Sequence, residues 1–178
     1  MTHPTPETHW KYVVSGGGGF IGSHLVDALL ASPATSEVRV LDNFSSGRRE
    51  HLVHHAGDSR LKIHTVDLLE AHAVVPLLGG VDVVVHLAAN PDIRWGLTNT
   101  RLDLDQETIV TYNVLEAMRL NQVKRILFSS SCAVYGDIGT EPAHEGRGPS
   151  LPPVYMVPGS LDRRVSFRHS AGRSRCLP

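Results

Sequence analysis

Three consecutive serines, at positions 129–131, follow an apolar run and come shortly before a tyrosine and a glycine, in the order FSSSCAVYG. A serine hydroxyl at the end of a strand can hydrogen-bond a reacting substrate oxygen, but it needs a proton-transferring group beside it. The cluster therefore indicates the edge of an active site, and the rest of the chain must supply its partners.

A glycine-rich run, SGGGGFIG at residues 15–22, has the residue types that bind a phosphate group. Gly16, Gly19 and Gly22 follow an apolar run and open a helical pattern, with the spacing G-x-x-G-x-x-G. Glycines permit a tight turn and let backbone N–H groups approach a pyrophosphate at the positive end of the helix. In isolation, a plain turn is the alternative interpretation of such a run.

Asp42 ends the next apolar run, twenty residues beyond Gly22. A carboxylate at that position can accept hydrogen bonds from both ribose hydroxyls of an adenosine, and it repels the 2′-phosphate of NADP. The glycine run and the acid together predict a dinucleotide site that prefers NAD. Arg48 and Arg49 follow closely, and we interpret them as solvated charges on the next helix.

Asp67 stands at the end of a third apolar run, in the segment VDL. Its spacing leaves two interpretations open. The carboxylate could hold the edge of an adenine ring, or it could cap the helix that follows.

Short apolar runs alternate with helical patterns, and these elements must position the groups above. The patterns predict strands at residues 12–15, 38–41, 61–66, 82–86 and 124–128, and helices at residues 20–31 and 107–121. Repeated strand–helix–strand units imply right-handed crossovers and a parallel sheet. The predicted fold is α/β, a doubly wound parallel sheet of the Rossmann-like kind, truncated after the fifth strand.

The composition of the 178 residues, with 41% hydrophobic and 20% charged residues, is typical of one soluble globular domain. A net charge of -1 gives no electrostatic reason to expect a nucleic-acid partner. The two cysteines, Cys132 and Cys176, suggest no disulfide framework and favour a cytoplasmic location. Residues 1–11 form a polar leader that we expect to be neither a signal peptide nor a membrane anchor.

Other reactive residue types have structural interpretations. His51, His54 and His55 have helical spacing, but without a clustered carboxylate or cysteine we interpret them as a solvated helix face and expect no metal site. His86 ends a buried apolar run, and we expect a satisfied core or rim histidine. Cys132 has no evident base beside it, and we expect it to pack as a small residue.

Six segments resemble, in order and spacing, the extended short-chain dehydrogenase/reductase family, and most closely its branch of UDP-glucose 4-epimerases among the NAD-dependent epimerases and dehydratases. The segments are SGGGGFIG, LDNFSSG, VDL, HLAANPDIR, TYNVLEAM and FSSSCAVYG, and the resemblance covers residues 12–136. The resemblance implies an NAD-binding domain over this range. The implied cofactor contacts are Gly16, Gly19, Phe20, Ile21 and Gly22 at the pyrophosphate, Asp42, Asn43 and the loop at residues 44–47 at the adenosine ribose, Asp67 and Leu68 at adenine, Leu87, Ala88 and Ala89 along the cofactor, Asn113 beside it, and Ser129 near the nicotinamide.

The resemblance also implies a reaction. In such an epimerase, a tyrosine takes the proton of the sugar 4-hydroxyl while hydride passes to NAD, and the hydride then returns to the other face of the ketone. Ser131 matches the catalytic serine or threonine, and Tyr155 lies close to the expected position of the tyrosine. The related 4,6-dehydratases carry Thr-Asp-Glu where this chain has Ser-Cys-Ala, which favours epimerisation. The implied partners are a nucleotide sugar, with a UDP-hexose first, and a second subunit of a homodimer.

After residue 136 the sequence departs from the family. A lysine is expected four residues after the tyrosine, but Gly159 stands there and no lysine follows Lys124. Residues 137–178 read as an irregular tail rich in Pro, Gly and Arg, and the substrate domain is expected to be absent. The codons of residues 155–158 permit a second frame that begins Tyr-Gly-Ala, so a frameshift just before Tyr155 is one interpretation. The chain would then be an inactive cofactor-binding fragment of an epimerase, and the alternative is a nonenzymatic dinucleotide-binding or sensor module.

Overall fold

The computed structural model describes residues 9–131, 135, 142 and 144. The chain divides into two compact units, residues 1–129 and 130–178, and the first contains every helix and strand named below. Its strands are β1 (Trp10–Ser15), β2 (Thr35–Asp42), β3 (Leu61–Thr65), β4 (Val83–His86) and β5 (Ile126–Phe128).

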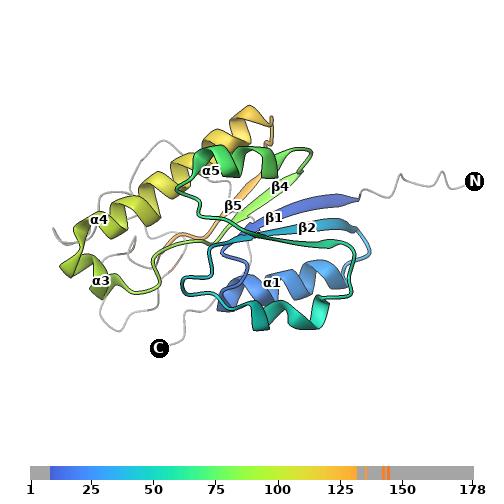
Figure 1. Cartoon of the computed structure of the whole chain (residues 1–178), viewed down its shortest axis with the longest axis horizontal. Coiled ribbons are helices and arrows are strands. Elements are labelled where there is room, and N and C mark those ends of the chain that lie inside the picture. Colours follow the sequence, from blue (N-terminus) through green and yellow to red (C-terminus); the bar gives the residue numbers. More distant parts are fainter. Residues whose placement is uncertain (1–8, 132–134, 136–141, 143, 145–178) are drawn as a thin grey trace, which may run out of the picture. The chain divides into compact units, whose positions relative to one another are not determined.

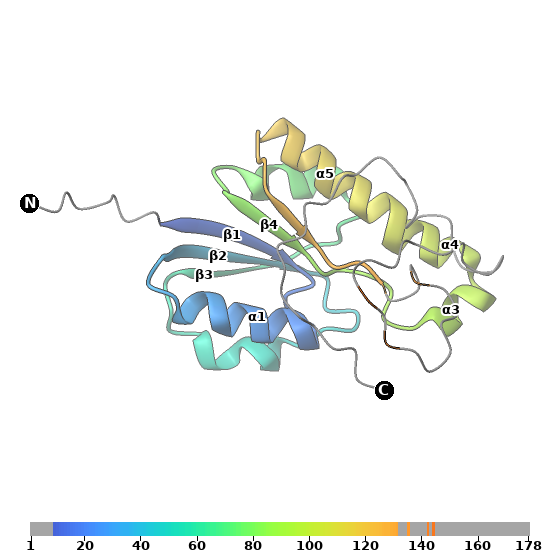
Figure 2. The same cartoon turned by 180° about the vertical axis from the view of Figure 1, so that it is seen from behind.

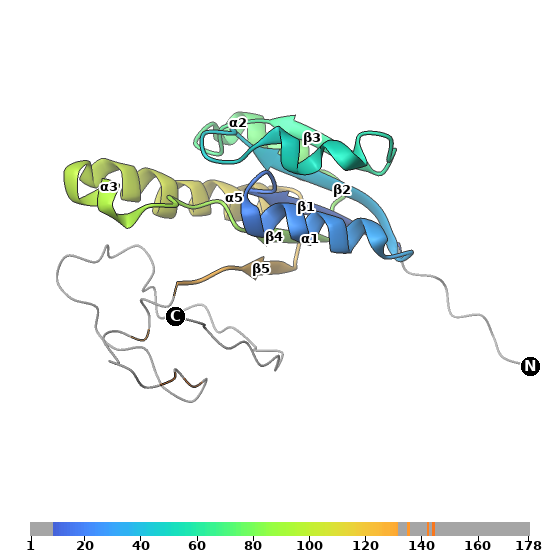
Figure 3. The same cartoon turned by 90° about the horizontal axis from the view of Figure 1, so that it is seen from below.

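The five strands form one parallel sheet in the order β3-β2-β1-β4-β5 (Figure 1). Figure 3 shows β5 at the outer edge of the sheet. Chain order reverses between β1 and β4, so successive crossovers cover opposite faces of the sheet. The predicted doubly wound fold is confirmed, and its switch point lies at the carboxyl ends of β1 and β4.

Helices cover both faces of the sheet. Figures 1 and 2 show α1 (Phe20–Ala31) and α5 (Val110–Leu120) on opposite sides of it. The segment η1 (Arg49–His55) contributes Leu52 to the core on the α1 side, whereas α2 (Ala71–Val74) and η2 (Val75–Leu78) contribute to the core on the α5 side.

Two apolar cores result, because successive side chains of a strand point to opposite faces. The core on the α5 side is built from Val13, Leu41, Leu68, Val74, Leu78, Val81, Val84, Val110, Val114, Ala117, Met118 and Val123. The core on the α1 side is built from Val14, Val26, Leu30, Val38, Val40, Leu52, Val83 and Val85. The alternation of Val13 and Val14, and of Val83 and Val84, shows why runs of valine form these central strands.

The predicted elements all occur, and their ends differ in a few places. The helix at residues 20–31 is confirmed, whereas β2 begins three residues earlier than predicted and β5 begins two residues later. The predicted helix at residues 107–121 is the end of a longer helical stretch, formed by α4 (Thr100–Asp103), the π-helical segment η3 (Leu104–Ile109) and α5. A further helix, α3 (Ile93–Thr98), precedes it. None of the helices in the described part of the chain has the length and apolar character that a membrane span requires.

Candidate functional site

A pocket of about 470 Å³ opens at the carboxyl ends of the strands, where a doubly wound fold binds its ligands. The glycine run and the segments that follow β2, β3, β4 and β5 all contribute to its wall. The lining residues are Gly16, Gly19, Phe20, Ile21, Gly22, Leu41, Asp42, Asn43, Ser45, Ser46, Gly47, Val66, Asp67, Leu68, Leu87, Ala88, Ala89, Pro91, Gln106, Val110 and Ser129. Every residue predicted to contact the cofactor is therefore in this wall, with the exceptions of Phe44 and Asn113.

The glycine run makes a turn that no larger residue fits. Gly16 has a φ of 73°, in the left-handed region, and a Cβ there would lie 2.8 Å from the backbone nitrogen of Ala88. A Cβ on Gly22 would lie 2.2 Å from the carbonyl oxygen of Gly16. Because these are backbone contacts, a side chain at either position forces the loop to move. The predicted phosphate loop is thus a close-packed turn that follows β1 and lies against the segment after β4.

The first turn of α1 faces the pocket. Gly19 is the N-cap, and its N–H donates to the carbonyl of Gly16 at 3.1 Å. The N–H groups of the following residues, Phe20 to Gly22, have no acceptor within the helix, because they belong to its first turn. Phe20 and Ile21 line the pocket and are 76% and 65% exposed. An anionic ligand at this position would accept hydrogen bonds from these backbone N–H groups and would also contact the apolar side chains of Phe20 and Ile21.

Asp42 is buried at the end of β2, and its carboxylate has a role that the sequence did not reveal. Oδ2 accepts a hydrogen bond from the N–H of Gly18 at 2.8 Å, and Oδ1 accepts one from the N–H of Phe44 at 2.8 Å. The carboxylate thus fastens the glycine run to the loop after β2. A carboxylate has about four acceptor positions, so capacity remains for ribose hydroxyls in the pocket.

The loop after β2 contains a strained residue. Phe44 has a φ of 56°, which is uncommon for a bulky side chain, and such residues cluster at functional sites. The guanidinium carbon of Arg49 lies 4.3 Å from the centroid of the Phe44 ring, and Arg49 also donates to the hydroxyl of Thr65. Arg48 and Arg49 are exposed, as predicted. However, Arg49 also packs on the loop, so it is not merely a solvated charge.

Asp67 lies in the pocket wall and stabilises its own turn, since its Oδ1 accepts from the N–H of Leu69 at 2.9 Å. The N-cap residue of α2 is Glu70. The alternative interpretation of Asp67 as a simple helix cap is therefore wrong.

Asn113 is the residue of α5 that the family resemblance places beside the cofactor. It is buried on α5 and is not among the residues that line the pocket. Its Nδ2 donates to the carbonyl oxygens of Leu68 and Leu69, at 2.9 and 3.0 Å. Asn113 thus holds the loop that carries Asp67 and Leu68, two residues of the pocket wall, and its place beside the bound cofactor stays a prediction.

Five lining residues were not predicted from the sequence: Leu41, Val66, Pro91, Gln106 and Val110. Leu41 and Val66 adjoin the predicted residues Asp42 and Asp67, and Pro91 comes two residues after the predicted Ala89, so these three could have been indicated by their neighbours. Gln106 lies in η3, and its position depends on a π-helical turn, a feature that is frequent at functional sites and has no simple sequence signal.

His86 is a satisfied core histidine at the end of β4, as predicted. Its Nδ1 lies 2.6 Å from the hydroxyl of Ser15, and its Nε2 lies 3.2 Å from the hydroxyl of Thr111. Burial lowers the pKa of His86 to about 4, so the ring is neutral at pH 7. It joins β1, β4 and α5 behind the pocket.

The serines after β5, where Ser129 is a predicted cofactor contact and Ser131 a predicted catalytic residue, are described in part. Ser129 continues from β5 with its N–H donating to the carbonyl of His86 at 3.2 Å, and it lines the pocket. Ser131 is exposed and belongs to the second unit. Tyr155, Cys132 and Gly159 lie outside the described residues. The roles of Ser131 and Tyr155 stay predictions.

The histidine-rich segment also corrects an expectation. We expected no carboxylate near His51, His54 and His55, but Asp27 of α1 lies within hydrogen-bonding distance of both His54 and His55. His51 lies apart from this group, with its Nδ1 2.9 Å from the carbonyl oxygen of Gly18. His51 and His54 are exposed, as a solvated helix face requires, but His55 is half-buried and the premise that no carboxylate lies nearby is wrong.

A parallel doubly wound sheet, a glycine turn at the first crossover and an acid after the second strand define a dinucleotide-binding domain. Residues 12–155 match the NAD dependent epimerase/dehydratase family, and the chain belongs to this family. NAD is the cofactor that the family description names.

The relatives include several kinds of nucleotide-sugar enzyme. The chain is 36% identical over 134 residues to a putative UDP-glucose 4-epimerase of Methanocaldococcus jannaschii, covering 75% of this chain and 42% of that protein. It is 35% identical over 145 residues to UDP-glucuronic acid decarboxylase 1 of Arabidopsis thaliana, covering 81% of this chain and 31% of that protein. The crystal structure of Thermus thermophilus UDP-glucose 4-epimerase in complex with NAD is similar, with a TM-score of 0.69 and 32% identity over 80% of this chain and 44% of that one. The chain thus spans less than half the length of these relatives.

Proposed function

We propose that this chain binds NAD in the pocket at the carboxyl ends of the strands. The observation that carries this proposal is the meeting of four separated segments in one wall: the glycine turn, the end of β2 with Asp42, the turn after β3 with Asp67, and the segment after β4. A dinucleotide is long and has a charged middle, so it suits a pocket with backbone donors at its centre and polar groups at one end.

Each part of the pocket suits one part of the cofactor. The pyrophosphate would lie on the N–H groups of Phe20, Ile21 and Gly22, beside Gly16 and Gly19. Asp42 and Asn43 would accept the adenosine ribose, and Asp67 and Leu68 would flank adenine. Leu87, Ala88, Ala89 and Ser129 would lie along the nicotinamide half, because they follow β4 and β5 across the switch point. Negative charge on Asp42 would disfavour the 2′-phosphate of NADP.

We further propose that the chain is the NAD-binding part of a nucleotide-sugar 4-epimerase. The proposed substrate is a UDP-hexose, and the proposed assembly is a homodimer. When bound, NAD supplies the acceptor and later the donor of a hydride at sugar C4. Ser131 would hydrogen-bond the 4-oxygen, and the Tyr155 phenolate would take the hydroxyl proton and return it. This proposal is supported by the similarity to 4-epimerases and by the Ser-Cys-Ala segment at residues 131–133, which lacks the acid pair of the related dehydratases.

A second candidate is sugar-nucleotide decarboxylation. It is favoured by the similarity to the UDP-glucuronic acid decarboxylase of Arabidopsis thaliana, which matches a larger share of this chain than the putative epimerase does. Both candidates use the same NAD pocket, so they must be separated by substrate.

The test compares two polypeptides: the 178-residue chain, and the product of the same gene read in the alternative frame from the codon of Tyr155. A tyrosine without a nearby lysine keeps a pKa near 10, so only about 0.1% is phenolate at pH 7, and we expect no turnover by the first polypeptide. We expect the second to interconvert UDP-glucose and UDP-galactose.

Three other outcomes separate the alternatives. Turnover of UDP-glucuronate with release of carbon dioxide, and no interconversion of the hexoses, would favour the decarboxylase. NAD binding without turnover of any nucleotide sugar by either polypeptide would favour a nonenzymatic dinucleotide-binding or sensor module. Clear epimerase turnover by the 178-residue chain would overturn the requirement for the lysine.

A further inference from the structure

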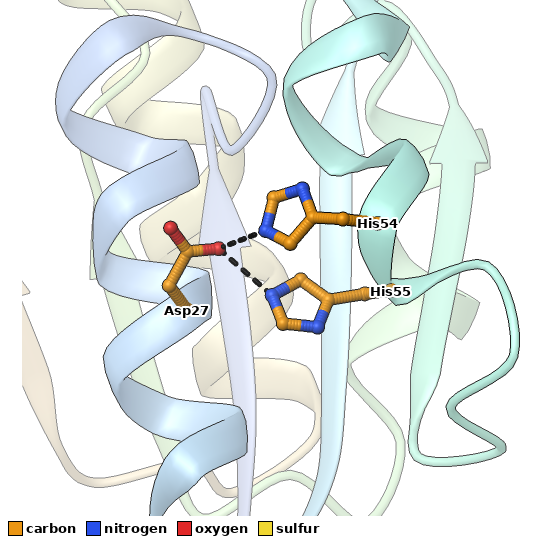
Figure 4. A group of neighbouring side chains, drawn as sticks. All are labelled: Asp27, His54 and His55. Carbon is orange, nitrogen blue, oxygen red and sulfur yellow. Dashed lines mark hydrogen bonds and ion pairs between the residues drawn. The ribbon is translucent and has the colours of Figure 1, made fainter.

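Two histidines and an aspartate from separate elements converge on one side of the sheet, away from the pocket. Figure 4 shows Asp27 on α1 facing His54 and His55 at the end of η1. The Nε2 atoms of His54 and His55 lie 2.9 and 2.8 Å from the same carboxylate oxygen, Oδ1 of Asp27. One ligand-type atom from each of the three residues lies within 4.8 Å of the other two.

The arrangement is more specific than a solvated helix face. Consecutive residues normally point in different directions from a helix, yet both imidazoles turn toward one oxygen, with ring centroids 4.1 Å apart. A third histidine, His24, approaches from α1 itself, with its Nδ1 3.6 Å from Oδ2 of Asp27. The side chains of His55 and Asp27 are 20% and 37% exposed, whereas those of His54 and His24 are 55% and 67% exposed, so the group lies at the surface and is open to ions from solvent.

The chemistry of the three groups suits metal binding. Oδ1 of Asp27 faces an imidazole nitrogen of His54 and one of His55, and carboxylate oxygen and imidazole nitrogen are both metal ligands. A histidine that donates an N–H to this carboxylate can exchange that proton for a metal ion, since neutral imidazole nitrogen is the ligand form.

We propose that Asp27, His54 and His55 bind a Zn²⁺ ion. Imidazole nitrogen and carboxylate oxygen are both Zn²⁺ ligands, at about 2.0–2.2 Å, and three protein ligands leave one tetrahedral position for water or His24. Two tetrahedral ligands of one ion lie about 3.3–3.4 Å apart. The nitrogen–oxygen separations of 2.9 and 2.8 Å must therefore widen by about 0.5 Å, which small side-chain rotations allow.

The site would act as a structural clip. The N–H of Arg48 donates to the carbonyl of Gly18 at 2.9 Å, and Nδ1 of His51 lies 2.9 Å from the same oxygen. The start of η1 is thus already bonded to the glycine run, and an ion at its other end would fix η1 to α1. None of Asp27, His54 and His55 lines the pocket, so the inference does not depend on the proposed function.

The experiment uses the untagged full-length chain, freed of metal with a chelator and titrated with ZnCl₂ in a calorimeter. We expect a single ion per chain and a rise in the thermal midpoint of unfolding on Zn²⁺ addition. Replacing a residue that only hydrogen-bonds to a metal ligand weakens metal affinity by about 10–100-fold. Loss of a ligand itself, in Asp27→Asn or in the double variant His54→Gln/His55→Gln, should therefore weaken Zn²⁺ binding by about 100-fold or more. The matched control is His72→Gln, which removes an exposed imidazole near a different carboxylate, Glu70, and should leave Zn²⁺ affinity unchanged.

X-ray absorption at the zinc edge identifies the ligands. We expect nitrogen and oxygen ligands at about 2.0–2.1 Å from the zinc and no sulfur ligand near 2.3 Å. A sulfur ligand would indicate that Cys132 or Cys176 binds the ion instead. Unfolding of each variant in the presence of chelator shows whether the variant is folded without metal. If the double variant is unfolded, Asp27→Asn still tests the site, because its side-chain amide oxygen remains a hydrogen-bond acceptor. Zn²⁺ affinity unchanged in Asp27→Asn, sulfur ligands, or no binding by the original chain would each overturn the proposal, whether or not NAD binds.

Discussion

Replacement of His86 by asparagine should remove a large part of the pH dependence of stability. The buried ring has a pKa of about 4 in the folded chain, against about 6.5 for an unperturbed histidine in the unfolded chain. The folded state therefore disfavours the proton. Stability from the neutral ring is complete above the unfolded pKa of about 6.5, and it is lost as the pH falls from there toward about 4.

The size of the effect follows from the two pKa values. A shift from about 6.5 to about 4 corresponds to about 3 kcal/mol in total, of which about 2 kcal/mol is lost between pH 8 and pH 5. The ring is 2% exposed, so solvent screens this energy little. The amide of an asparagine can still reach the hydroxyl of Ser15 but does not titrate.

The assay is urea denaturation of the original chain and of His86→Asn at pH 8 and pH 5. We expect the variant to be less stable at pH 8, because part of the ring packing against Phe128 is lost. The gap between the two proteins should narrow by about 2 kcal/mol at pH 5. His64, whose pKa is also lowered by burial, titrates in both proteins and cancels in the difference. A gap that stays the same at both pH values would refute the reasoning, as would an equal narrowing in the exposed control His72→Asn.

Three further predictions concern the pocket and its chemistry. Gly22→Ala should abolish measurable NAD binding in calorimetry, because its Cβ would lie 2.2 Å from a backbone oxygen, whereas Gly57→Ala, with no atom within 4 Å of the added Cβ, should bind as the original chain does. Asn113→Ala should lower the free energy of unfolding by about 1–3 kcal/mol, measured in urea, because two backbone carbonyls lose their buried donor, and an unchanged value would remove its supporting role. In a turnover-competent polypeptide, Ser131→Ala should lower turnover by about 10²-fold with little change in stability, and unchanged turnover would assign Ser131 to packing.

The sequence was most informative where a group's position depends on nearby residues. The glycine spacing sets the turn, and Asp42 stands at the end of the adjacent parallel strand, so the fold brings them to one edge of the sheet. The family resemblance implied that Asp67, Leu87 and Ser129 also contact the cofactor, and each of them lies in the pocket wall just after a parallel strand.

Features that depend on packing between distant elements could not be predicted in this way. Asp27 meets His54 and His55 only because η1 packs beside α1, and neither element's pattern specifies the partner. Asn113 on α5 bonds to the loop after β3, and its two partners, Leu68 and Leu69, lie 45 and 44 positions earlier in the chain. The π-helical turn at η3, which brings Gln106 to the pocket, has no simple sequence signal.

The central claim is that the pocket binds NAD and uses Asp42 to discriminate against NADP. It is tested most directly by calorimetric titration of the 178-residue chain with NAD and with NADP, alongside Asp42→Ala. We predict that the original chain binds NAD more tightly than NADP, and that the variant loses this preference because the charge that repels the 2′-phosphate is gone. NADP binding as tight as or tighter than NAD binding by the original chain, or no binding of either cofactor, would contradict the claim.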